Sequence, residues 1–255
     1  MIPAEALPRI DILGVRVSAI DMHDALSAFE HWIDERERTY VCVTGVHGVM
    51  ESQSDPDLAG IHNGSGLTTP DGVPMVWCGR FAGARKMTRV YGPDLMLEVC
   101  RRGAERGWKM YLYGAAPGVP EELSERLGAR FPGLSVVGTF SPPYRDLSAE
   151  EVAAIVGRIN AAKPDIVWVG LSTPKQERWM NGFRPLLEAP ILVGVGAAFD
   201  IHAGRLPQAP RWMQSSGLEW SYRLAKEPRR LWRRYLSNNP RFLWSIVRRP
   251  PKLVP

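Results

Sequence analysis

Several features of common protein classes are missing from these 255 residues. There are only three cysteines, Cys42, Cys78 and Cys100, and each lies in an apolar segment without metal-ligand spacing. An odd number of scattered cysteines suits neither a disulfide framework nor a zinc site, so we expect buried free thiols and a reducing compartment. No run of about 18 apolar residues is present, so no helix is expected to span a bilayer. The first residues lack a signal-peptide pattern, and a cytoplasmic protein is therefore expected.

Short motifs of several enzyme classes are also missing. The chain has no G-x-x-x-x-G-K-[ST] phosphate loop and no G-x-S-x-G nucleophile elbow. Its five histidines form no pair at ligand spacing, and Asp55-Pro56-Asp57 is typical of a helix cap, so we expect neither a metal nor a cofactor. Gly194-Val-Gly196 resembles the start of a dinucleotide fingerprint but lacks its third small residue and its later acidic residue. A nicotinamide-dependent dehydrogenase is therefore not expected.

The apolar residues that are present alternate between strand and helix patterns. Runs such as Tyr40–Thr44, Trp108–Tyr113 and Ile166–Val169 are typical of buried parallel strands, and helical periodicity follows them. We also expect one strand at Ile12–Val17 and a domain boundary near Ala203–Pro210, where glycine and two prolines meet a change of charge. The alternation predicts an α/β fold with a doubly wound, mainly parallel, Rossmann-like sheet.

Charge divides the chain into two parts. Residues 205–255 hold 12 Lys and Arg against two acids, a formal +10, whereas residues 1–204 hold 20 bases against 25 acids. We therefore expect an α/β catalytic domain at 1–204 and a basic, helical appendage at 205–255 that meets an anionic surface or polyanion. Tryptophans are interleaved with these basic residues, a pattern that fits the surface of an anionic membrane. We expect Trp232 and Trp244 to face the membrane and Trp212 and Trp220 to pack onto the domain. RNA binding is the alternative for the appendage.

Small and polar residues follow the expected strands. In a doubly wound sheet, ligands bind beyond the carboxyl ends of the strands, and glycine there allows close approach of the backbone to a phosphate. Asp71 follows a strand and precedes a helix, so it is either the helix N-cap or a carboxylate base at the edge of a site. Arg89 ends a basic loop and is either solvated or a phosphate ligand. The other candidates at these ends are Thr44, Gly114, Gly170 and Gly196.

Longer strings of residues carry a family resemblance. They include TPDG at 69–72, RVYGPDL at 89–95, PKQE at 174–177, VGAAFD at 195–200, LEWSYRL at 218–224 and EPRR at 227–230. In this order, over roughly residues 10–240, the chain resembles the WecG/TagA/CpsF family of bacterial glycosyltransferases. The resemblance implies a metal-independent, inverting transfer of a sugar from a UDP donor to a polyprenyl-diphosphate-linked acceptor in cell-surface polysaccharide synthesis.

The same resemblance implies roles for individual residues. Asp71 matches the catalytic base and Thr44 a polar residue of the pocket, while Arg89 and Gln176 match residues that contact the donor. Arg223, Arg230 and Arg233 match arginines of the appendage that reach the diphosphate while it docks peripherally on the inner face of the membrane. Homo-oligomers are possible in such a family.

One departure from the family pattern concerns the donor sugar. The family usually has an asparagine shortly after the strand that holds Thr44, whereas this chain has Gly45-Val-His47-Gly48. Either His47 substitutes as the polar group, or the pocket favours a sugar that lacks the usual substituent. The resemblance implies an N-acetylhexosamine or its uronic acid as the donor, and this departure adds a hexose. A soluble hydrolase or epimerase of nucleotide sugars is the alternative enzyme, and a nucleic-acid-binding module the alternative outside enzymes.

Overall fold

A computed structural model describes residues 7–254, except for the side chains of Arg230 and Arg234. The chain forms two compact units. Among the described residues, the first unit holds 26–42 and 92–206, and the second holds 7–25, 43–91 and 207–254. The chain therefore enters the first unit twice. It passes into the second unit for the last time after Leu206, within the segment Ala203–Pro210 where the net charge of the sequence changes sign.

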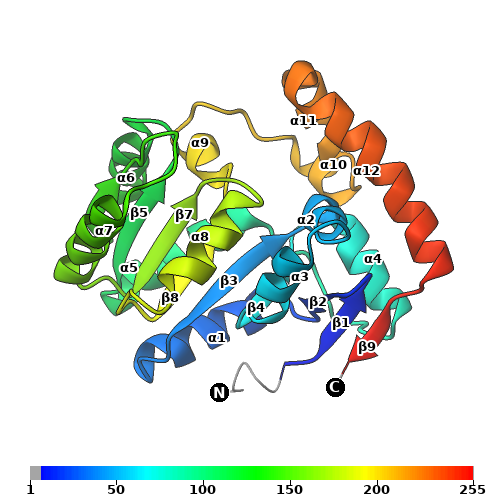
Figure 1. Ribbon diagram of the computed structural model, residues 1–255, viewed down its shortest axis with the longest axis horizontal. Coiled ribbons are helices and arrows are strands. Elements are labelled where there is room, and N and C mark those ends of the chain that lie inside the picture. The colour runs from blue at the N-terminus through cyan, green and yellow to red at the C-terminus, as the bar shows by residue number, and fades with distance from the viewer. Residues whose placement is uncertain (1–6, 255) are drawn as a thin grey trace. The chain divides into compact units, whose positions relative to one another are not determined.

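A six-stranded sheet has the order β4-β3-β8-β7-β5-β6 (Figure 1). The pairs from β3 through β8, β7 and β5 to β6 are all parallel. Helices follow the strands in alternation, which confirms the predicted doubly wound α/β fold. The strands of the first unit are β3 (Thr39–Thr44, whose last two residues belong to the second unit), β5 (Lys109–Gly114), β6 (Ser135–Phe140), β7 (Ile166–Gly170) and β8 (Ile191–Gly194).

Local sequence signals explain several helix ends in the first unit. At the start of α7, the Ser148 hydroxyl accepts from the N–H of Glu151, whose carboxylate accepts from the N–H of Ser148. That helix ends where Lys163 adopts a left-handed conformation. The helices of this unit are α1 (Met22–Asp34, which begins in the second unit), α5 (Gly92–Arg106), α6 (Val119–Arg130), α7 (Ala149–Ala162), α8 (Lys175–Phe183) and α9 (Ala198–His202).

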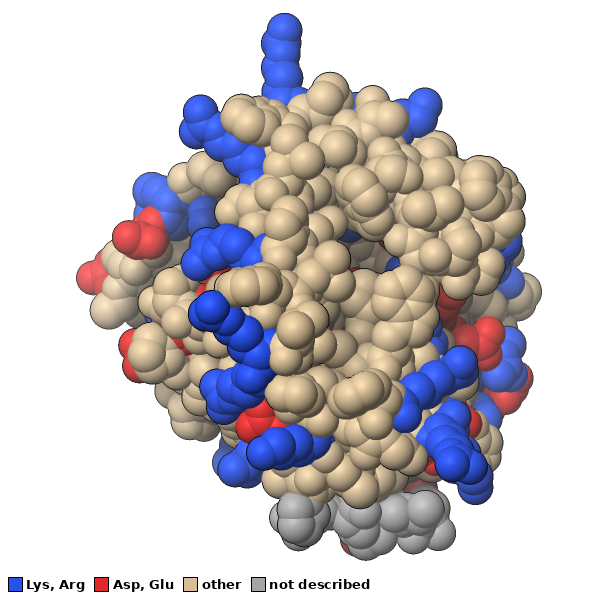
Figure 2. Space-filling model, turned by 90° about the vertical axis from the view of Figure 1, so that its right-hand side faces the viewer, with Lys and Arg blue, Asp and Glu red and all other residues tan. Residues whose placement is uncertain are grey.

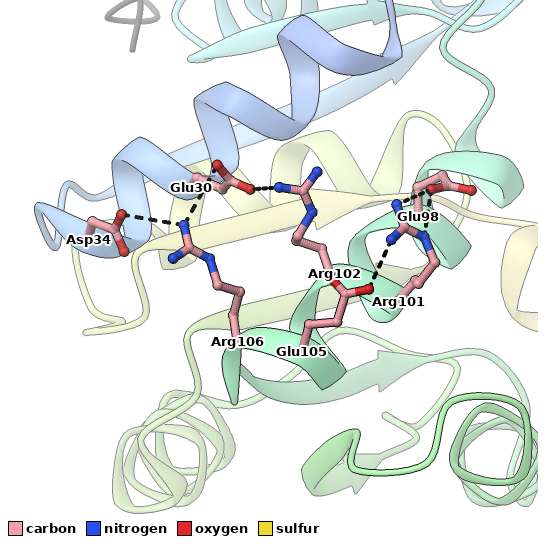
Figure 3. A network of polar contacts seen from close by, with 7 residues as sticks. All are labelled: Glu30, Asp34, Glu98, Arg101, Arg102, Glu105 and Arg106. Carbon is pink, nitrogen blue, oxygen red and sulfur yellow. Dashed lines mark hydrogen bonds and ion pairs between the residues drawn. The ribbon is translucent and has the colours of Figure 1, made fainter.

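Ion pairs join α1 to α5 (Figure 3). Glu30 of α1 accepts from Arg102 and lies 3.7 Å from Arg106, and both arginines are on α5. A separate cluster on the surface of α5 places Arg101 between Glu98 and Glu105 (Figure 3). Because these last side chains are exposed, each pair contributes only a few tenths of a kcal/mol, roughly.

The second unit contains a three-stranded antiparallel sheet of order β2-β1-β9. Its strands are β1 (Arg9–Ile12), β2 (Val15–Ser18) and β9 (Lys252–Val254), and the unit also holds β4 (Leu67–Pro70). The expectation of one strand at Ile12–Val17 was wrong. Leu13 and Gly14 both have positive φ, and the N–H of Gly14 donates to Asp11 Oδ1, so the chain reverses there as a tight hairpin.

The appendage shares the core of the second unit. Buried side chains from the hairpin, including Ile10 and Val17, belong to one hydrophobic cluster with Met75 and Cys78 of α4 and Phe242 of α12. The three cysteines are buried and free, as predicted. None of the described helices is long and apolar enough to cross a membrane. The helices of this unit are α2 (Val46–Glu51), α3 (Pro56–Asn63), α4 (Val73–Phe81), α10 (Arg211–Ser215), α11 (Glu219–Lys226) and α12 (Pro228–Arg248).

Candidate active site

The backbone of Asp71 is held from both sides. Its N–H donates to the carbonyl oxygen of Thr44 at 3.0 Å, and its own carbonyl oxygen accepts from Nε of Arg89. The N-cap position of α4 is occupied by Gly72, so Asp71 stands one residue before the cap. A Cβ added at Gly45 would lie 3.8 Å from Asp71 Oδ2, which places the carboxylate beside the first residues after β3. The backbone of Asp71 is thus held at the ends of two strands, and its carboxylate lies beside Gly45.

Arg89 connects this segment to the appendage. Its Nη2 donates to Glu219 at 2.5 Å, and its guanidinium lies 3.9 Å from the centre of the Tyr91 ring. The Tyr91 hydroxyl also donates to Glu219, at 2.8 Å. Burial alone would lower the pKa of Arg89, but the charges of Asp71 and Glu219 and the hydrogen bond to Glu219 raise it above its ordinary value. Arg89 therefore stays cationic between two carboxylates.

The three predicted arginines of the appendage differ in their surroundings. Arg223 on α11 is partly buried, and its Nε has no hydrogen-bond partner among the described residues. Burial opposes the charge of Arg223, but Tyr235, Tyr91, Glu219 and Asp71 raise its pKa. Arg233 is exposed and lies over the Trp232 ring, and the side chain of Arg230 is outside the described part of the chain. Of the two arginines whose side chains are described, Arg223 is the one in the electrostatic neighbourhood of Asp71.

Thr44 has a partner that the sequence did not indicate. Its hydroxyl lies 3.2 Å from Nδ1 of His62, and both side chains are buried. The carbonyl oxygen of His62 accepts from the hydroxyls of Ser65 and Thr68. Burial lowers the pKa of His62 to about 4, so this imidazole is neutral at physiological pH. His62 therefore holds the Thr44 hydroxyl in place through a buried hydrogen bond.

The predicted pocket residue His47 contacts the long helix of the appendage. Its Nδ1 lies 3.3 Å from Nδ2 of Asn238 on α12 and 3.5 Å from Oε1 of Glu51. Asp21, His23 and Asp24 form a separate polar cluster, in which one ligand atom of each residue lies within 4.8 Å of those of the other two. The carboxylates of Asp21 and Asp24 accept from each other's backbone N–H, which is the geometry of a helix start.

The remaining predicted residues lie in the first unit, at the carboxyl ends of its strands. A Cβ at Gly114 would lie 2.8 Å from the backbone of Gly170, and a Cβ at Gly170 would lie 2.8 Å from the Phe199 ring. Close packing therefore requires glycine at both positions, and their role in substrate binding stays a prediction. Gly196 has positive φ, and a Cβ there would lie 3.4 Å from Oε1 of Gln176.

Gln176 is the buried polar group at this edge. The side chain is 3% exposed, and its amide nitrogen donates to Glu177 Oε1 at 3.1 Å. Its Oε1 has no hydrogen-bond partner within residues 7–254. A buried acceptor without a donor costs about 1–3 kcal/mol. That cost is removed if a ligand donates a hydrogen bond there.

The sequence matches the model of the glycosyl transferase WecG/TagA/CpsF family over residues 10–253. The chain belongs to this family. Among the curated members of the WecG/TagA/CpsF family, it is 27% identical over 219 residues to the N-acetylglucosaminyldiphosphoundecaprenol N-acetyl-beta-D-mannosaminyltransferase of Bacillus subtilis, with 86% of this chain and 83% of the relative covered. It is 28% identical over 217 residues to the protein of the same name from Bacillus spizizenii, with 85% and 82% covered. The predicted recognition and the glycosyltransferase class are confirmed.

Two residues of the Asp71 neighbourhood were not among the predicted site residues of this WecG/TagA/CpsF member. Glu219 lies in the LEWSYRL string, which carries the family resemblance. The sequence does not indicate that its carboxylate pairs with Arg89. His62 is a single histidine on a short helix, and nothing in the sequence distinguishes it from a core histidine. Both became visible only through contacts between segments distant in the chain.

Proposed function

We propose that this glycosyltransferase moves an N-acetylhexosamine, or a closely related hexose or uronic acid, from a UDP donor to a polyprenyl-diphosphate-linked sugar. The two Bacillus relatives are named for transfer of N-acetylmannosamine onto N-acetylglucosaminyldiphosphoundecaprenol, which supports an acceptor of this kind. The observation that carries the proposal is Asp71, whose backbone is held by Thr44 and Arg89, with Glu219 and Arg223 in its electrostatic neighbourhood.

Asp71 acts as the general base. The acceptor hydroxyl attacks the anomeric carbon of the donor sugar while the bond from that carbon to the UDP oxygen breaks on the opposite face. Asp71 takes the proton of the hydroxyl, help that typically accelerates a reaction by about 10²–10⁴-fold. The configuration at the anomeric carbon inverts because the two bonds lie on opposite faces.

The departing diphosphate needs positive charge. The Nε, Nη1 and Nη2 groups of Arg89 donate to Asp71, Gln214 and Glu219, respectively. Arg223 has an unsatisfied Nε, so we assign the diphosphate to Arg223 and the orientation of Asp71 to Arg89. Removing one such donor typically costs about 3 kcal/mol of transition-state stabilisation. With arginine in this role the reaction proceeds without a divalent metal, and Gln176 contributes to donor binding through its buried Oε1.

The acceptor's lipid requires contact with a membrane. The appendage carries a formal +10, and Trp232 and Trp244 on α12 are exposed, as are Trp212 and Trp220. Each basic residue near an anionic surface contributes about 1 kcal/mol to binding. We infer peripheral docking on the cytoplasmic leaflet, where nucleotide sugars are available.

A direct test is release of UDP from a panel of UDP-sugars with and without N-acetylglucosaminyl-diphosphate-polyprenol. The proposal expects release that depends on the lipid-linked acceptor, yields a product one sugar larger and persists in EDTA. Release of UDP at the same rate without acceptor would instead indicate a nucleotide-sugar hydrolase. Complete dependence on added Mg²⁺ or Mn²⁺ would contradict the assignment of the diphosphate to arginine.

A further inference from the structure

The segment that follows Asp71 combines exposed aromatic side chains with charge of one sign. Residues 72–90 contain Arg80, Arg85, Lys86 and Arg89 and no acidic residue. Within this segment, α4 turns Met75 and Cys78 toward the core of the second unit. One turn apart on its outer side, Trp77 is 58% exposed and Phe81 is 75% exposed. Large apolar side chains so exposed, with basic residues beside them, indicate an interaction surface.

The long helix α12 presents a similar outer face and packs on the same core. Phe242 of α12 lies in the buried cluster that contains Met75 and Cys78 of α4. Four exposed apolar residues of α12 stand at positions i, i+4, i+11 and i+15, a spacing that places them on one line along a helix. These residues are Trp232, Leu236, Leu243 and Val247.

The surroundings of these two outer faces are apolar with a basic margin. Figure 2 looks onto the side where α4 and α12 lie and shows a broad area without charged side chains, with Lys and Arg along its edges. The turn between α10 and α11 lies close to α4, since a Cβ at Gly217 would be 3.3 Å from Val73 and 3.8 Å from the Trp77 ring. The appendage and α4 therefore contribute to one region of the second unit.

We infer that α4 is a second membrane-contact element, whose Trp77 and Phe81 enter the boundary between headgroups and acyl chains of an anionic bilayer. The inference rests on the proposed function, because a lipid-linked acceptor must bring its lipid near Asp71, and α4 begins two residues after Asp71. Basic side chains at the margin then meet anionic headgroups, while the aromatic side chains leave water.

Charge favours a bilayer over a second copy of the chain as the occupant. A symmetric dimer through this face would bring the basic residues of both copies, Arg80, Arg85 and Lys86, into one interface. Like charges opposed across an interface are unfavourable, whereas anionic headgroups complement them. The aromatic pair and the basic residues therefore fit the same partner.

The test measures partition of the full-length protein onto vesicles of phosphatidylcholine with and without phosphatidylglycerol, over a series of salt concentrations. The variant Trp77→Ser/Phe81→Ser removes the two apolar side chains, and Tyr144→Ser is the matched control, since Tyr144 is 95% exposed but lies in the first unit. We expect the double variant to bind anionic vesicles at least about tenfold more weakly at every salt concentration, and the control to bind within about twofold of the wild type. Equal binding of the double variant and the wild type would overturn the inference.

Two further measurements separate the competing explanations. Light scattering without lipid measures self-association. If the wild type is a dimer, the double variant is a monomer and both bind vesicles equally, this face is a dimer interface. That result would overturn the inference. Turnover is compared on a short-chain, water-soluble acceptor and on a vesicle-embedded one, and the double variant should lose activity only on the second. If the wild type transfers no sugar to either acceptor but binds vesicles through Trp77 and Phe81, the proposed function fails and the membrane contact stands.

Discussion

Glu219 on α11 accepts a hydrogen bond from Nη2 of Arg89 at 2.5 Å, although 130 positions separate the two residues. Arg89 also donates from Nε to the carbonyl oxygen of Asp71. The appendage is thereby connected through a single guanidinium to the backbone of the proposed base. Both side chains of the pair are mostly buried, so solvent screens the interaction only weakly.

Replacing Glu219 by Gln should weaken both stability and turnover. The carboxylate accepts from Arg89 and from the Tyr91 hydroxyl, and hydrogen bonds to charged groups contribute about 1.5–3 kcal/mol each. We expect a loss of about 2 kcal/mol in the free energy of unfolding, and kcat/KM about tenfold lower because Arg89 no longer holds Asp71 in place. Urea unfolding and UDP release measure the two effects.

The matched control for this prediction is Glu98→Gln. Glu98 pairs with Arg101 on the exposed surface of α5, where such pairs contribute about 0–1 kcal/mol. The Glu98→Gln variant should leave both the free energy of unfolding and kcat/KM near their wild-type values. Equal losses in the two variants would mean that the Arg89–Glu219 pair is no more important than a surface ion pair.

His62 should make stability depend on pH. Burial lowers its pKa to about 4 from an ordinary 6.5, so between these values the unfolded chain binds a proton that the folded chain does not. Its contribution is complete above about pH 6.5 and is lost as the pH falls toward 4, by up to about 3 kcal/mol. In the His62→Gln variant, this part of the decline in unfolding free energy between pH 7 and pH 4 should disappear.

The control is His23→Gln, which removes an exposed histidine of α1. Burial also lowers the pKa of His202, so a smaller decline remains in every variant. The measurement is the free energy of unfolding of the wild type and both variants at about pH 7, 5.5 and 4.5. Identical pH slopes for the wild type and His62→Gln would show that burial does not lower the pKa of His62 in the folded protein.

Gln176→Met should weaken binding of UDP without loss of the fold. Methionine nearly preserves the volume but has neither the amide nitrogen nor the buried Oε1. If a donor group of UDP satisfies Oε1, the affinity for UDP should fall by about tenfold, the equivalent of one hydrogen bond. Calorimetric titration with UDP tests this, and an unchanged dissociation constant would remove Gln176 from the donor site.

Phe242→Ala should unfold the second unit more easily, because Phe242 lies in the buried core that α12 shares with β1, β2 and α4. Truncation of a buried phenylalanine costs about 3–5 kcal/mol. Val247→Ala, at an exposed position of the same helix, should cost less than about 0.5 kcal/mol. Equal unfolding midpoints for the two variants would mean that the appendage does not contribute to this core.

The parallel sheet could be predicted from the sequence because its signals are local. Buried strands are continuous apolar runs, and the strand expected at Ile166–Val169 is found at Ile166–Gly170. The β1–β2 hairpin was missed because Leu13-Gly14 is a weak turn signal between residues that all favour strands. Strand β9 pairs with β1 from the other end of the chain, and no local pattern indicates such a partner.

The same distinction applies to the candidate site. Asp71, Arg89 and Arg223 could be named in advance from strand ends, charge and the family strings, and they share one neighbourhood in the second unit. The partners that hold them, Glu219 for Arg89 and His62 for Thr44, depend on contacts between distant segments. Single polar residues on short helices carry no signal of such contacts in the sequence.

The central claim is that Asp71 is the base of the transfer reaction, and Asp71→Asn tests it most directly. Asparagine preserves the size and the backbone contacts to Thr44 and Arg89 but cannot accept the proton at neutral pH. With UDP-sugar and lipid-linked acceptor, the account predicts a fall in kcat of at least about 10²-fold and a dissociation constant for UDP within about threefold of the wild type. Turnover near the wild-type rate in Asp71→Asn would contradict it.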